Sequence, residues 1–243
     1  MESVQNIVEY YDEFFPADEQ LLNFFSTVIS SYAAPARLLS IASNTGTLEM
    51  TLAQKNCDIT GLEVLQPFLE TSVLKRRTQL MSIRFFRLST VEMGKFLGKD
   101  FYHIIYCLNN RIAHIHSQDC MEKFFEDCHA LLQNGGVVIL QVHNYEKLSD
   151  RSKFTLTSRK STRATLSTDI HICNDKKVAV TQTLETDHGK TMPVITEEEV
   201  FPLARESIMQ FGKKAGFTEF NFYSDFQLTP FTGDAENLIS IIR

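Results

Sequence analysis

The chain has 243 residues, and its hydrophobic content of 43% is enough to fill the core of one large domain or of a domain with an insertion. Its formal net charge is −6 and its Lys and Arg residues are scattered, which excludes a strongly basic surface for nucleic acid and favours a small-molecule partner. No apolar run could span a bilayer, and the N-terminal segment does not resemble a secretory signal, so we expect no membrane association and a cytoplasmic location.

The first 32 residues predict two helices, a short leading one and a longer one. Apolar residues recur at helical spacing after Asp18, whose side chain is a suitable N-cap for the second helix. Pro35 ends the helical pattern just before the first apolar run of the chain.

Two short apolar runs, residues 38–41 and 59–62, suit buried strands of a parallel sheet. Between them, a loop of small and turn-forming residues, 42–46, leads to an amphipathic helix over residues 47–54. Glu63 directly follows the second strand. Open α/β sheets bind ligands at the carboxyl ends of their strands, where a carboxylate can accept both ribose hydroxyls, so this unit predicts a nucleoside-binding half.

The alternation of helices and strands continues along the chain. The predicted elements are a helix over 66–80, strands over 83–88 and 101–107, a helix over 120–132 and a strand over 137–142. The Asn-Gly-Gly run at 134–136 is expected to end the last of these helices. This order predicts a doubly wound, mostly parallel sheet.

The composition changes from Phe154 onward, where Thr is frequent and apolar residues alternate with polar ones. Together with the turn signal Asn174-Asp175, this pattern predicts an antiparallel β meander. We expect the meander, residues 151–194, to be inserted into a Rossmann-like domain that comprises residues 1–150 and 195–243.

The end of the chain predicts one helix and two strands. The helix is expected over about residues 197–215, in spite of Pro202 in its first part, and Gly216 ends it. Residues 217–223 and 238–242 then predict the two closing strands.

The order of these elements resembles that of class I S-adenosylmethionine-dependent methyltransferases, from about Tyr10 to the C-terminus. Glu63 lies at the position of the ribose-binding acid of that family, and LLQNGGVVILQVHNY is similar to its LLKPGG helix–strand junction. The resemblance implies a seven-stranded sheet, and S-adenosylmethionine as the cofactor.

The glycine loop of the family, acid-x-Gly-x-Gly-x-Gly, corresponds here to SIASNTG, residues 40–46. Only Gly46 matches a family glycine, because Ala42 and Asn44 replace the other two and Ser40 replaces the acid. Loss of the acid removes a charge-assisted contact, which costs about 1.5–3 kcal/mol, so we expect weakened rather than abolished cofactor binding.

A narrower resemblance is to glycine and sarcosine N-methyltransferases and their small-molecule relatives. YCLNNRIAHI, residues 106–115, is similar to their LGNSxAHL segment, and residues 141–146 are similar to their QxxNYD run. The glycine enzyme carries an arginine that holds a substrate carboxylate where this chain has His143, so glycine is a poor guess for the methyl acceptor.

The resemblance implies a role for each candidate site residue. The cofactor-binding candidates are Ser40, Ala42, Asn44, Gly46, Glu63, Val64, Ser89, Thr90, Leu108 and Asn110. His114 and Tyr145 are the catalytic candidates, since His114 could orient ligands or accept a proton from an ammonium acceptor. Tyr11 and His143 are candidates for the acceptor pocket, with Tyr10 beside them.

Several of these residues also have plain structural interpretations. Gly46 could be an ordinary loop glycine, and Glu63 could cap a helix. Val64 is equally consistent with core packing, and His114 with a loop histidine satisfied by protein partners. His114 and His116 form a pair with no suitably spaced third ligand, so we expect no metal.

The five cysteines are odd in number and lack Cys-x-x-Cys spacing, which predicts reduced core thiols. They are Cys57, Cys107, Cys120, Cys128 and Cys173.

The sequence thus predicts a methyltransferase that uses S-adenosylmethionine and acts on a small molecule, with an amine as one candidate acceptor. The alternative is a catalytically silent relative that binds a ligand or a partner, because the glycine loop is altered. A nicotinamide-dependent oxidoreductase is a third reading, although the loop lacks the GxGxxG pattern. The sequence leaves a homodimer open.

Overall fold

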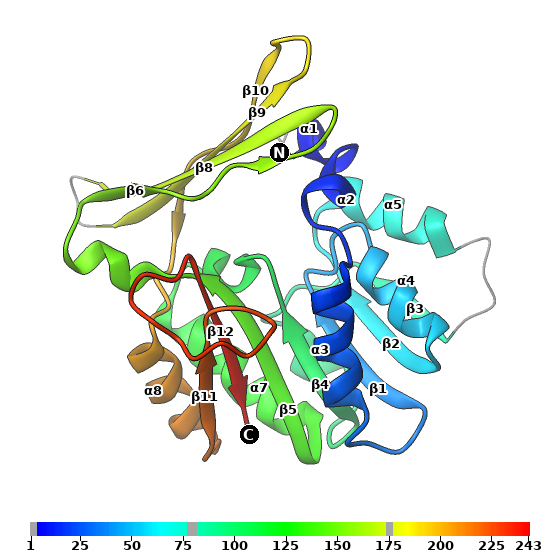
Figure 1. Ribbon diagram of the computed structural model, residues 1–243. Coiled ribbons are helices and arrows are strands. Elements are labelled where there is room, and N and C mark those ends of the chain that lie inside the picture. Colours follow the sequence, from blue (N-terminus) through cyan, green and yellow to red (C-terminus); the bar gives the residue numbers. More distant parts are fainter. Residues whose placement is uncertain (1–3, 77–81, 174–176) are drawn as a thin grey trace.

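The computed structural model describes residues 4–76, 82–173 and 177–243, which form two β-sheets and their flanking helices (Figure 1). The main sheet consists of β1 (Ala36–Ile41), β2 (Cys57–Leu62), β3 (Ile83–Phe86), β4 (Tyr102–Cys107), β5 (Leu132–His143), β11 (Phe220–Tyr223) and β12 (Asn237–Ile242). Their order is β11-β12-β5-β4-β1-β2-β3. The first five strands of the chain are parallel, whereas β12 is antiparallel to both β5 and β11. The predicted doubly wound, mostly parallel seven-stranded sheet is confirmed.

Helices cover both faces of this sheet. They are α3 (Glu19–Ile29), α4 (Thr47–Gln54), α5 (Gln66–Arg76), α6 (Met93–Phe96), α7 (Gln118–Leu131) and α8 (Arg205–Ala215), with short 3₁₀ turns η1 (Arg111–His114) and η2 (Tyr145–Ser149). Alternate residues of a strand point to opposite faces. Leu38 and Ile104 therefore join the core under α3 and α4, while Leu39 and Ile105 join the core under α7 and α8.

The helices closest to the prediction are those with clear local signals. The Asp18 side chain accepts a hydrogen bond from Leu21 N at 2.9 Å and begins α3, as its N-cap position predicted. Helix α4 has the predicted bounds. Helix α5 is described to Arg76, and the last residues of the predicted helix, 77–80, lie outside the described residues.

The second sheet confirms the predicted antiparallel meander. Its strands are β6 (Lys153–Thr155), β7 (Arg159–Lys160), β8 (Ala164–Ile172), β9 (Val178–Thr186) and β10 (Thr191–Val200), in the order β10-β9-β8-β6 with β7 beside β8. The turn signal at 174–175 lies outside the described residues. The division of the chain into two domains at residues 151 and 194 stays a prediction, and the last strand of the second sheet extends to Val200.

The predicted helix over 197–215 is wrong in its first part, because residues 197–200 complete β10 and pair with β9. Pro202 has no backbone N–H to continue a helix, and Phe201 N donates to Ala113 O at 2.7 Å instead. Helix α8 begins only at Arg205. It ends at Gly216, whose φ of +108° is left-handed, as the C-terminal glycine predicted.

The Asn-Gly-Gly run at 134–136 belongs to β5 and does not end a helix, so that expectation is wrong. Helix α7 already ends at Leu131, and Leu132 pairs with Tyr102 of β4. The register then shifts before Val137, and Gly135 has a φ of +76° in this irregular stretch. The glycines therefore allow a bulge at the start of the strand.

The N-terminus forms two short helices, α1 (Gln5–Val8) and α2 (Tyr11–Phe14), where one leading helix was predicted. They lie beside the second sheet, above the carboxyl ends of the main strands (Figure 1). A third apolar core joins them to both sheets, since Tyr11 and Phe14 pack with Phe68 of α5 and with Leu166 and Leu184 of the second sheet. The N-terminal helices thus form part of a roof over the strand ends.

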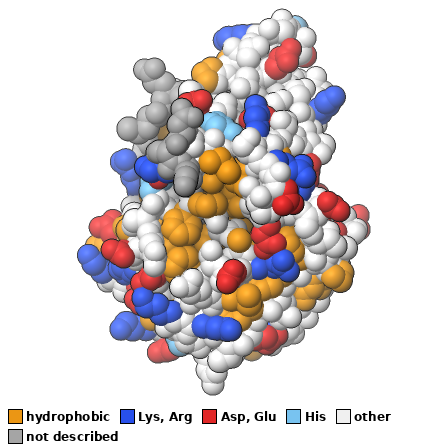
Figure 2. Space-filling view, turned by 90° about the vertical axis from the view of Figure 1, so that its left-hand side faces the viewer, with side chains coloured by type: hydrophobic (Ala, Val, Ile, Leu, Met, Phe, Trp, Pro, Cys, Tyr) orange, Lys and Arg blue, Asp and Glu red, His pale blue; other side chains and the backbone are white. Residues whose placement is uncertain are grey.

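On the face shown in Figure 2, hydrophobic side chains gather in the middle of the surface, and charged side chains of both signs border them. Among the described residues, no helix combines the length and the apolar composition needed to cross a membrane.

Candidate functional site

A cleft lies across the carboxyl ends of the parallel strands, where the strand order reverses between β1 and β4. Several adjoining hollows make it up. The loop hollow is lined by Ser40, Ala42, Asn44, Glu49 and Arg159, among others, and the roof hollow by Val64, Asn110, His114, His143 and Glu198, among others. Tyr11, Asn44 and Asn109 line both. This is the place where open α/β sheets bind ligands.

Two further hollows extend this cleft. The edge hollow is lined by Ala42, Val64, Ser89, Thr90 and Arg111, among others. The insert hollow reaches under the second sheet and is lined by His143, Arg159, Gln182, Glu236 and Asn237, among others. The roof hollow is the largest of the four, with an empty volume of about 1480 Å³ that includes its open mouth.

The loop after β1 keeps a left-handed backbone where the sequence has lost two glycines. Ala42, Asn44 and Gly46 have φ angles of 54°, 51° and 74°. Asn tolerates this region because its side chain can bond to nearby backbone, and here Asn44 Nδ2 donates to Ala42 O at 2.7 Å. The altered loop therefore still makes the bend, and its residues line the loop hollow.

Gly46 is required for packing as well as for its backbone angle. A Cβ at this position would lie 2.7 Å from Phe85 Cζ and 2.9 Å from Ser72 Cβ, distances that real atoms do not adopt. Gly46 does not line the hollows described above, whereas its neighbours Ala42 and Asn44 do. The glycine therefore lets the loop approach β3 and α5 closely.

Glu63 lies at the end of β2 and is 1% exposed. Its Oε2 accepts from Asn44 N at 2.9 Å, and its Oε1 accepts from Leu65 N at 2.8 Å. The carboxylate thus ties the bend after β1 to the end of β2 instead of projecting into bulk water. Each oxygen keeps a second lone pair beyond these two backbone donors.

Ser40, at the end of β1, forms a hydrogen bond with an acid of helix α4 that the sequence did not predict. Its Oγ donates to Glu49 Oε1 at 2.6 Å, and the Tyr106 hydroxyl donates to the same oxygen at 2.9 Å. Glu49 is 3% exposed and lines the loop hollow, and burial raises the pKa of its carboxyl group. A buried acid therefore lies one hydrogen bond away from Ser40.

Asn110 and Tyr145, which are distant in sequence, are hydrogen-bonded to each other. Asn110 Nδ2 donates to the Tyr145 hydroxyl at 2.8 Å, and Asn110 Oδ1 accepts from His143 N at 3.1 Å. Tyr145 is 4% exposed and does not line the hollows described, so its hydroxyl holds Asn110 in place beneath the roof hollow. Leu108 lines the loop hollow.

His114 lies between the edge and roof hollows and pairs with a carboxylate from the second sheet. Its Nδ1 is 2.7 Å from Glu198 Oε1 of β10. Burial lowers the pKa of His114, and the Glu198 carboxylate partly opposes this shift. The ring is therefore neutral near pH 7, with Nδ1–H assigned as the donor to Glu198 and Nε2 as a free acceptor.

His143 is also neutral, because burial lowers its pKa to about 4. Its Nδ1 is 3.3 Å from Asn237 Oδ1, and the ring lines the roof and insert hollows. Tyr11 is buried, and its hydroxyl accepts from Asn109 Nδ2 at 3.0 Å. Tyr10 lies outside these hollows, with the Arg163 guanidinium 4.6 Å from its ring centre.

The roof is attached to the loop after β1 through Asp12 of α2. The Asp12 carboxylate accepts from Thr45 Oγ1 at 2.5 Å, from Thr47 Oγ1 at 2.8 Å and from Lys75 Nζ at 2.5 Å. Hydrogen bonds from Lys75, Thr45 and Thr47 outweigh burial and hold the Asp12 pKa below its ordinary value. Helix α2 is therefore fixed directly over the loop hollow.

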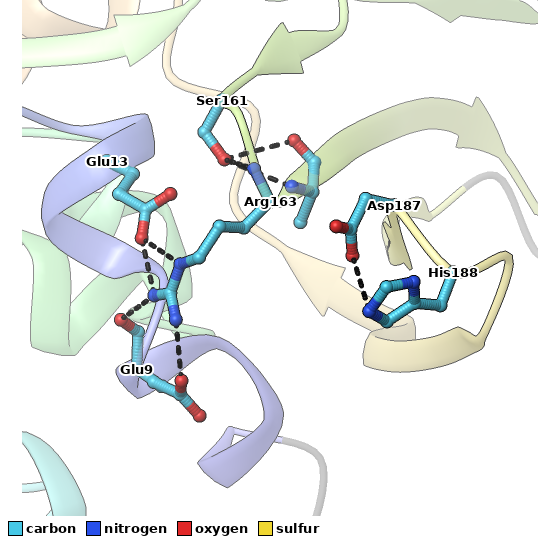
Figure 3. Close-up of polar contacts among 7 residues, drawn as sticks. Glu9, Glu13, Ser161, Arg163, Asp187 and His188 are labelled. Atoms are coloured by element: carbon cyan, nitrogen blue, oxygen red, sulfur yellow. Dashed lines mark hydrogen bonds and ion pairs between the residues drawn. The ribbon is translucent and has the colours of Figure 1, made fainter.

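Arg163, in the turn before β8, attaches the roof to the second sheet. Figure 3 shows its guanidinium pointing between Glu9 and Glu13 of the N-terminal helices, at 2.8 and 2.5 Å from their carboxylates. Asp187 and His188 lie on the far side of the turn and form a separate contact (Figure 3). The N-terminal segment is thus held from both sides of the cleft.

No model of a known protein family matches the sequence, and no curated protein matches it. Solved structures match along nearly the whole chain. A S-adenosylmethionine-dependent methyltransferase from Clostridium acetobutylicum superposes with a TM-score of 0.78 at 17% identity, over 98% of this chain and 97% of that one. The CcbJ methyltransferase from Streptomyces caelestis has a TM-score of 0.75 at 14% identity, over 96% and 94% of the two chains.

A third match is CalS10, an amino pentose methyltransferase from Micromonospora echinaspora whose structure contains bound S-adenosylmethionine. Its TM-score is 0.64 at 15% identity, over 93% of this chain and 90% of that one. The chain has the class I methyltransferase fold. Both the main sheet and the inserted antiparallel sheet fall within these matches, since so little of either chain lies outside them.

On this methyltransferase fold, most of the predicted site residues come together at one cleft. Those that line its hollows are Ser40, Ala42, Asn44, Val64, Ser89, Thr90, Leu108, Asn110, His114, Tyr11 and His143. Gly46, Glu63 and Tyr145 lie next to it and contact lining residues. Their roles in binding and catalysis stay predictions.

Sequence reasoning missed several charged residues that line the cleft, among them Glu49, Arg159 and Glu198. Glu49 is on a helix face that reads as amphipathic, and Glu198 is within a run of three glutamates that carries no motif. Arg159 belongs to the short strand β7 and lines the loop and insert hollows. In the part of the chain that the structure describes, no cluster of three or more His, Cys, Asp or Glu side chains could hold a metal ion.

Proposed function

We propose that this protein is a methyltransferase that uses S-adenosylmethionine to methylate an amine of a small molecule. The observation that carries this proposal is the cleft at the switch point of the sheet, with its left-handed loop after β1 and the acid Glu63 at the end of β2. The fold of the matched methyltransferases supports it.

The donor set of the loop fits such a cofactor. Ser43 Oγ and Asn44 Oδ1 are buried polar atoms that find no hydrogen-bond partner among the described residues, and both residues line the loop hollow. Unpaired buried polar atoms are costly, so they favour a polar ligand at this bend. An apolar wall at Val64 and hydroxyls at Ser89 and Thr90 in the edge hollow suit a flat, polar-edged ring such as adenine.

Each part of the cofactor would then be held by a different element. Glu63 would accept ribose hydroxyls with the lone pairs that Asn44 N and Leu65 N leave free. Ser89 and Thr90 would bond to the adenine edge, and the loop of Ala42 and Asn44 would line the amino-acid part. When bound, S-adenosylmethionine supplies an electrophilic methyl group on a sulfonium.

The acceptor would occupy the roof and insert hollows. Methyl transfer requires a free lone pair on the acceptor, so an ammonium group must first lose a proton. His114 is suited to take this proton on Nε2, because it is neutral and Glu198 fixes its tautomer. Asn110, His143 and Gln182 would orient the acceptor by hydrogen bonds, and Tyr145 would hold Asn110 in position.

An amino sugar is one acceptor of this kind, and its hydroxyls would suit the polar wall of the insert hollow. CalS10, which acts on an amino pentose, supports this choice. The residue matches at Leu108, Asn110 and His114 support a relationship to the glycine and sarcosine enzymes, which stays a proposal.

Calorimetry with S-adenosylmethionine and S-adenosylhomocysteine tests the proposal directly. We expect binding of both, and the absence of heat and of any thermal shift at millimolar concentration would contradict it. A titration with NADH serves as the control for the oxidoreductase reading. Binding of S-adenosylmethionine without turnover of any acceptor in a broad screen of amines would instead favour the catalytically silent alternative. The cytoplasmic location and the homodimer also stay predictions.

A further inference from the structure

Glu49 is a buried carboxylate for which no direct ion pair is found among the described residues, although the charge of Lys75 acts on it from a distance. It is 3% exposed, and no Lys, Arg or His side chain forms an ion pair with it. Taking an ionised carboxylate out of water is unfavourable unless it is paired or hydrogen-bonded. A buried carboxylate in such a place therefore points to a compensating interaction.

Two hydrogen-bond donors partly offset the burial that raises the pKa of Glu49. Ser40 Oγ and the Tyr106 hydroxyl both donate to Oε1, at 2.6 and 2.9 Å. Two donors directed at one oxygen stabilise a carboxylate more than a neutral acid, because a neutral acid accepts hydrogen bonds less strongly. The two donors therefore lower the cost of a negative charge on Glu49, and both of them are directed at Oε1.

Glu49 also borders open space. It lines the loop hollow together with Ser40, Ala42 and Asn44, the loop residues to which the amino-acid part of the cofactor was assigned. A positively charged group that enters this hollow would meet a carboxylate whose hydration has already been lost. Such an interaction is stronger than one with a fully hydrated acid on the surface.

We propose that Glu49 supplies the carboxylate that binds the α-ammonium group of S-adenosylmethionine, in place of the acid that Ser40 replaces. The inference rests on the proposed function. Ser40 at the end of β1 and Glu49 on α4 together rebuild one acidic site: the serine hydroxyl orients the carboxylate, and the helix carries the charge. Glu49 is thus a cofactor-binding residue, and Ser40 a positioning residue.

Arg159 adds a second charge to the same hollow. Its guanidinium lies 4.5 Å from the centre of the Phe15 ring and donates to Phe14 O at 3.0 Å, and no carboxylate in the described part of the chain forms an ion pair with it. One hollow therefore offers an anion on α4 and a cation on β7. This pair of charges suits a zwitterionic amino-acid group.

The test compares S-adenosylhomocysteine with its deaminated analogue, which keeps the adenosine, the sulfur and the carboxylate. By calorimetry near pH 7, the wild-type protein is expected to bind the deaminated analogue about tenfold to a hundredfold more weakly, the range of one charge-assisted hydrogen bond. Glu49→Gln should bind S-adenosylhomocysteine more weakly by a similar factor and should no longer discriminate between the two ligands.

Glu70→Gln is the matched control, because Glu70 is an exposed carboxylate on α5 outside the hollows. It should keep the wild-type affinities for both ligands. Circular dichroism and thermal unfolding check that each variant is folded. If Glu49→Gln does not fold, Ser40→Ala takes its place, with a severalfold smaller discrimination expected because Glu49 loses one donor.

The outcomes separate this inference from the proposed function. Equal affinity of the wild-type protein for the two ligands would overturn the inference alone, as would full discrimination in the substituted protein. Failure of the wild-type protein to bind either ligand would overturn the proposed function and this inference with it.

Discussion

At the scale of single residues, the cleft is governed by how burial and hydrogen bonds set the charge of each side chain. Burial lowers the pKa of both His114 and His143, but His114 is hydrogen-bonded to a carboxylate, Glu198, whereas His143 is hydrogen-bonded to the amide of Asn237. The Glu198 carboxylate raises the His114 pKa, whereas burial lowers it. The pKa of His114 is therefore the property of the site that a single substitution should change most clearly.

We predict that kcat/KM rises with pH through the pKa of His114, because only the neutral ring accepts a proton. In Glu198→Gln, the charge that raises this pKa is removed, so the rise of kcat/KM with pH should occur at lower pH. The value of kcat/KM at high pH should also fall, because the ring loses its fixed orientation. The measurement is the pH profile of kcat/KM together with a titration of His114 by NMR.

The control for this prediction is Glu199→Gln, the next residue of β10, whose carboxylate pairs with Lys177 on the surface. Its profile should match that of the wild-type protein. If the rise of kcat/KM with pH reflected deprotonation of the acceptor amine instead, it would occur at the same pH in every variant. An unchanged His114 titration in Glu198→Gln would show that the pair does not set the charge of the ring.

At the scale of secondary structure elements, local patterns predicted most of the main sheet because its central strands β1, β2 and β4 are short and almost fully buried. The bounds of α4 and the N-cap at Asp18 followed from signals within a few residues. The helix expected over 197–215 failed because pairing with β9 overrides helical spacing in residues 197–200. Pairing between distant strands leaves little trace in a local window.

The N-terminal helices are the element whose attachment should control access to the cleft. Arg163 is half exposed, and ion pairs in contact with water contribute little to stability, so Arg163→Gln should hardly change global stability. We predict that it increases hydrogen exchange in residues 5–14 and weakens binding of S-adenosylhomocysteine severalfold. Exchange measured by mass spectrometry, with and without the ligand, checks this expectation.

Arg151→Gln is the matched control for Arg163→Gln, because Arg151 is exposed and lies outside the cleft. It should leave both exchange and affinity unchanged. If exchange at residues 5–14 were the same in Arg163→Gln as in the wild-type protein, the contacts of Asp12 with Thr45 and Lys75 would be sufficient to hold the roof.

At the scale of the whole molecule, the site could be predicted only where one segment carries it. The loop after β1, Glu63 and the Asn110–His114 stretch were expected at the cleft because each lies at a recognisable place in a strand–loop–helix order, and they do lie at or beside it. Glu49, Arg159 and Glu198 were not expected there, since each is placed at the cleft by a contact with another element: with Ser40, Phe15 and His114. The sequence therefore predicts the order of strands, loops and helices at the cleft, whereas its charged lining residues become visible only in the three-dimensional structure.

The three cores also predict how the molecule unfolds. The core around Tyr11, Phe68 and Leu166 joins both sheets, so we expect a single cooperative thermal transition although the chain contains two sheets. S-Adenosylhomocysteine at a hundred times its Kd should add about 2.7 kcal/mol to the free energy of unfolding. For a chain of this size, that corresponds to a Tm shift of roughly 5–10 °C.

Scanning calorimetry with and without the ligand measures this directly. One transition that shifts as a whole would mean that the second sheet, the N-terminal helices and the main sheet unfold together. Two transitions, of which only one moves with the ligand, would show instead that the insertion folds as a separate domain. In that case Arg159 and Glu198 would reach the cleft only when the insertion packs against the main sheet. Ligand affinity should then fall on heating before the main sheet unfolds.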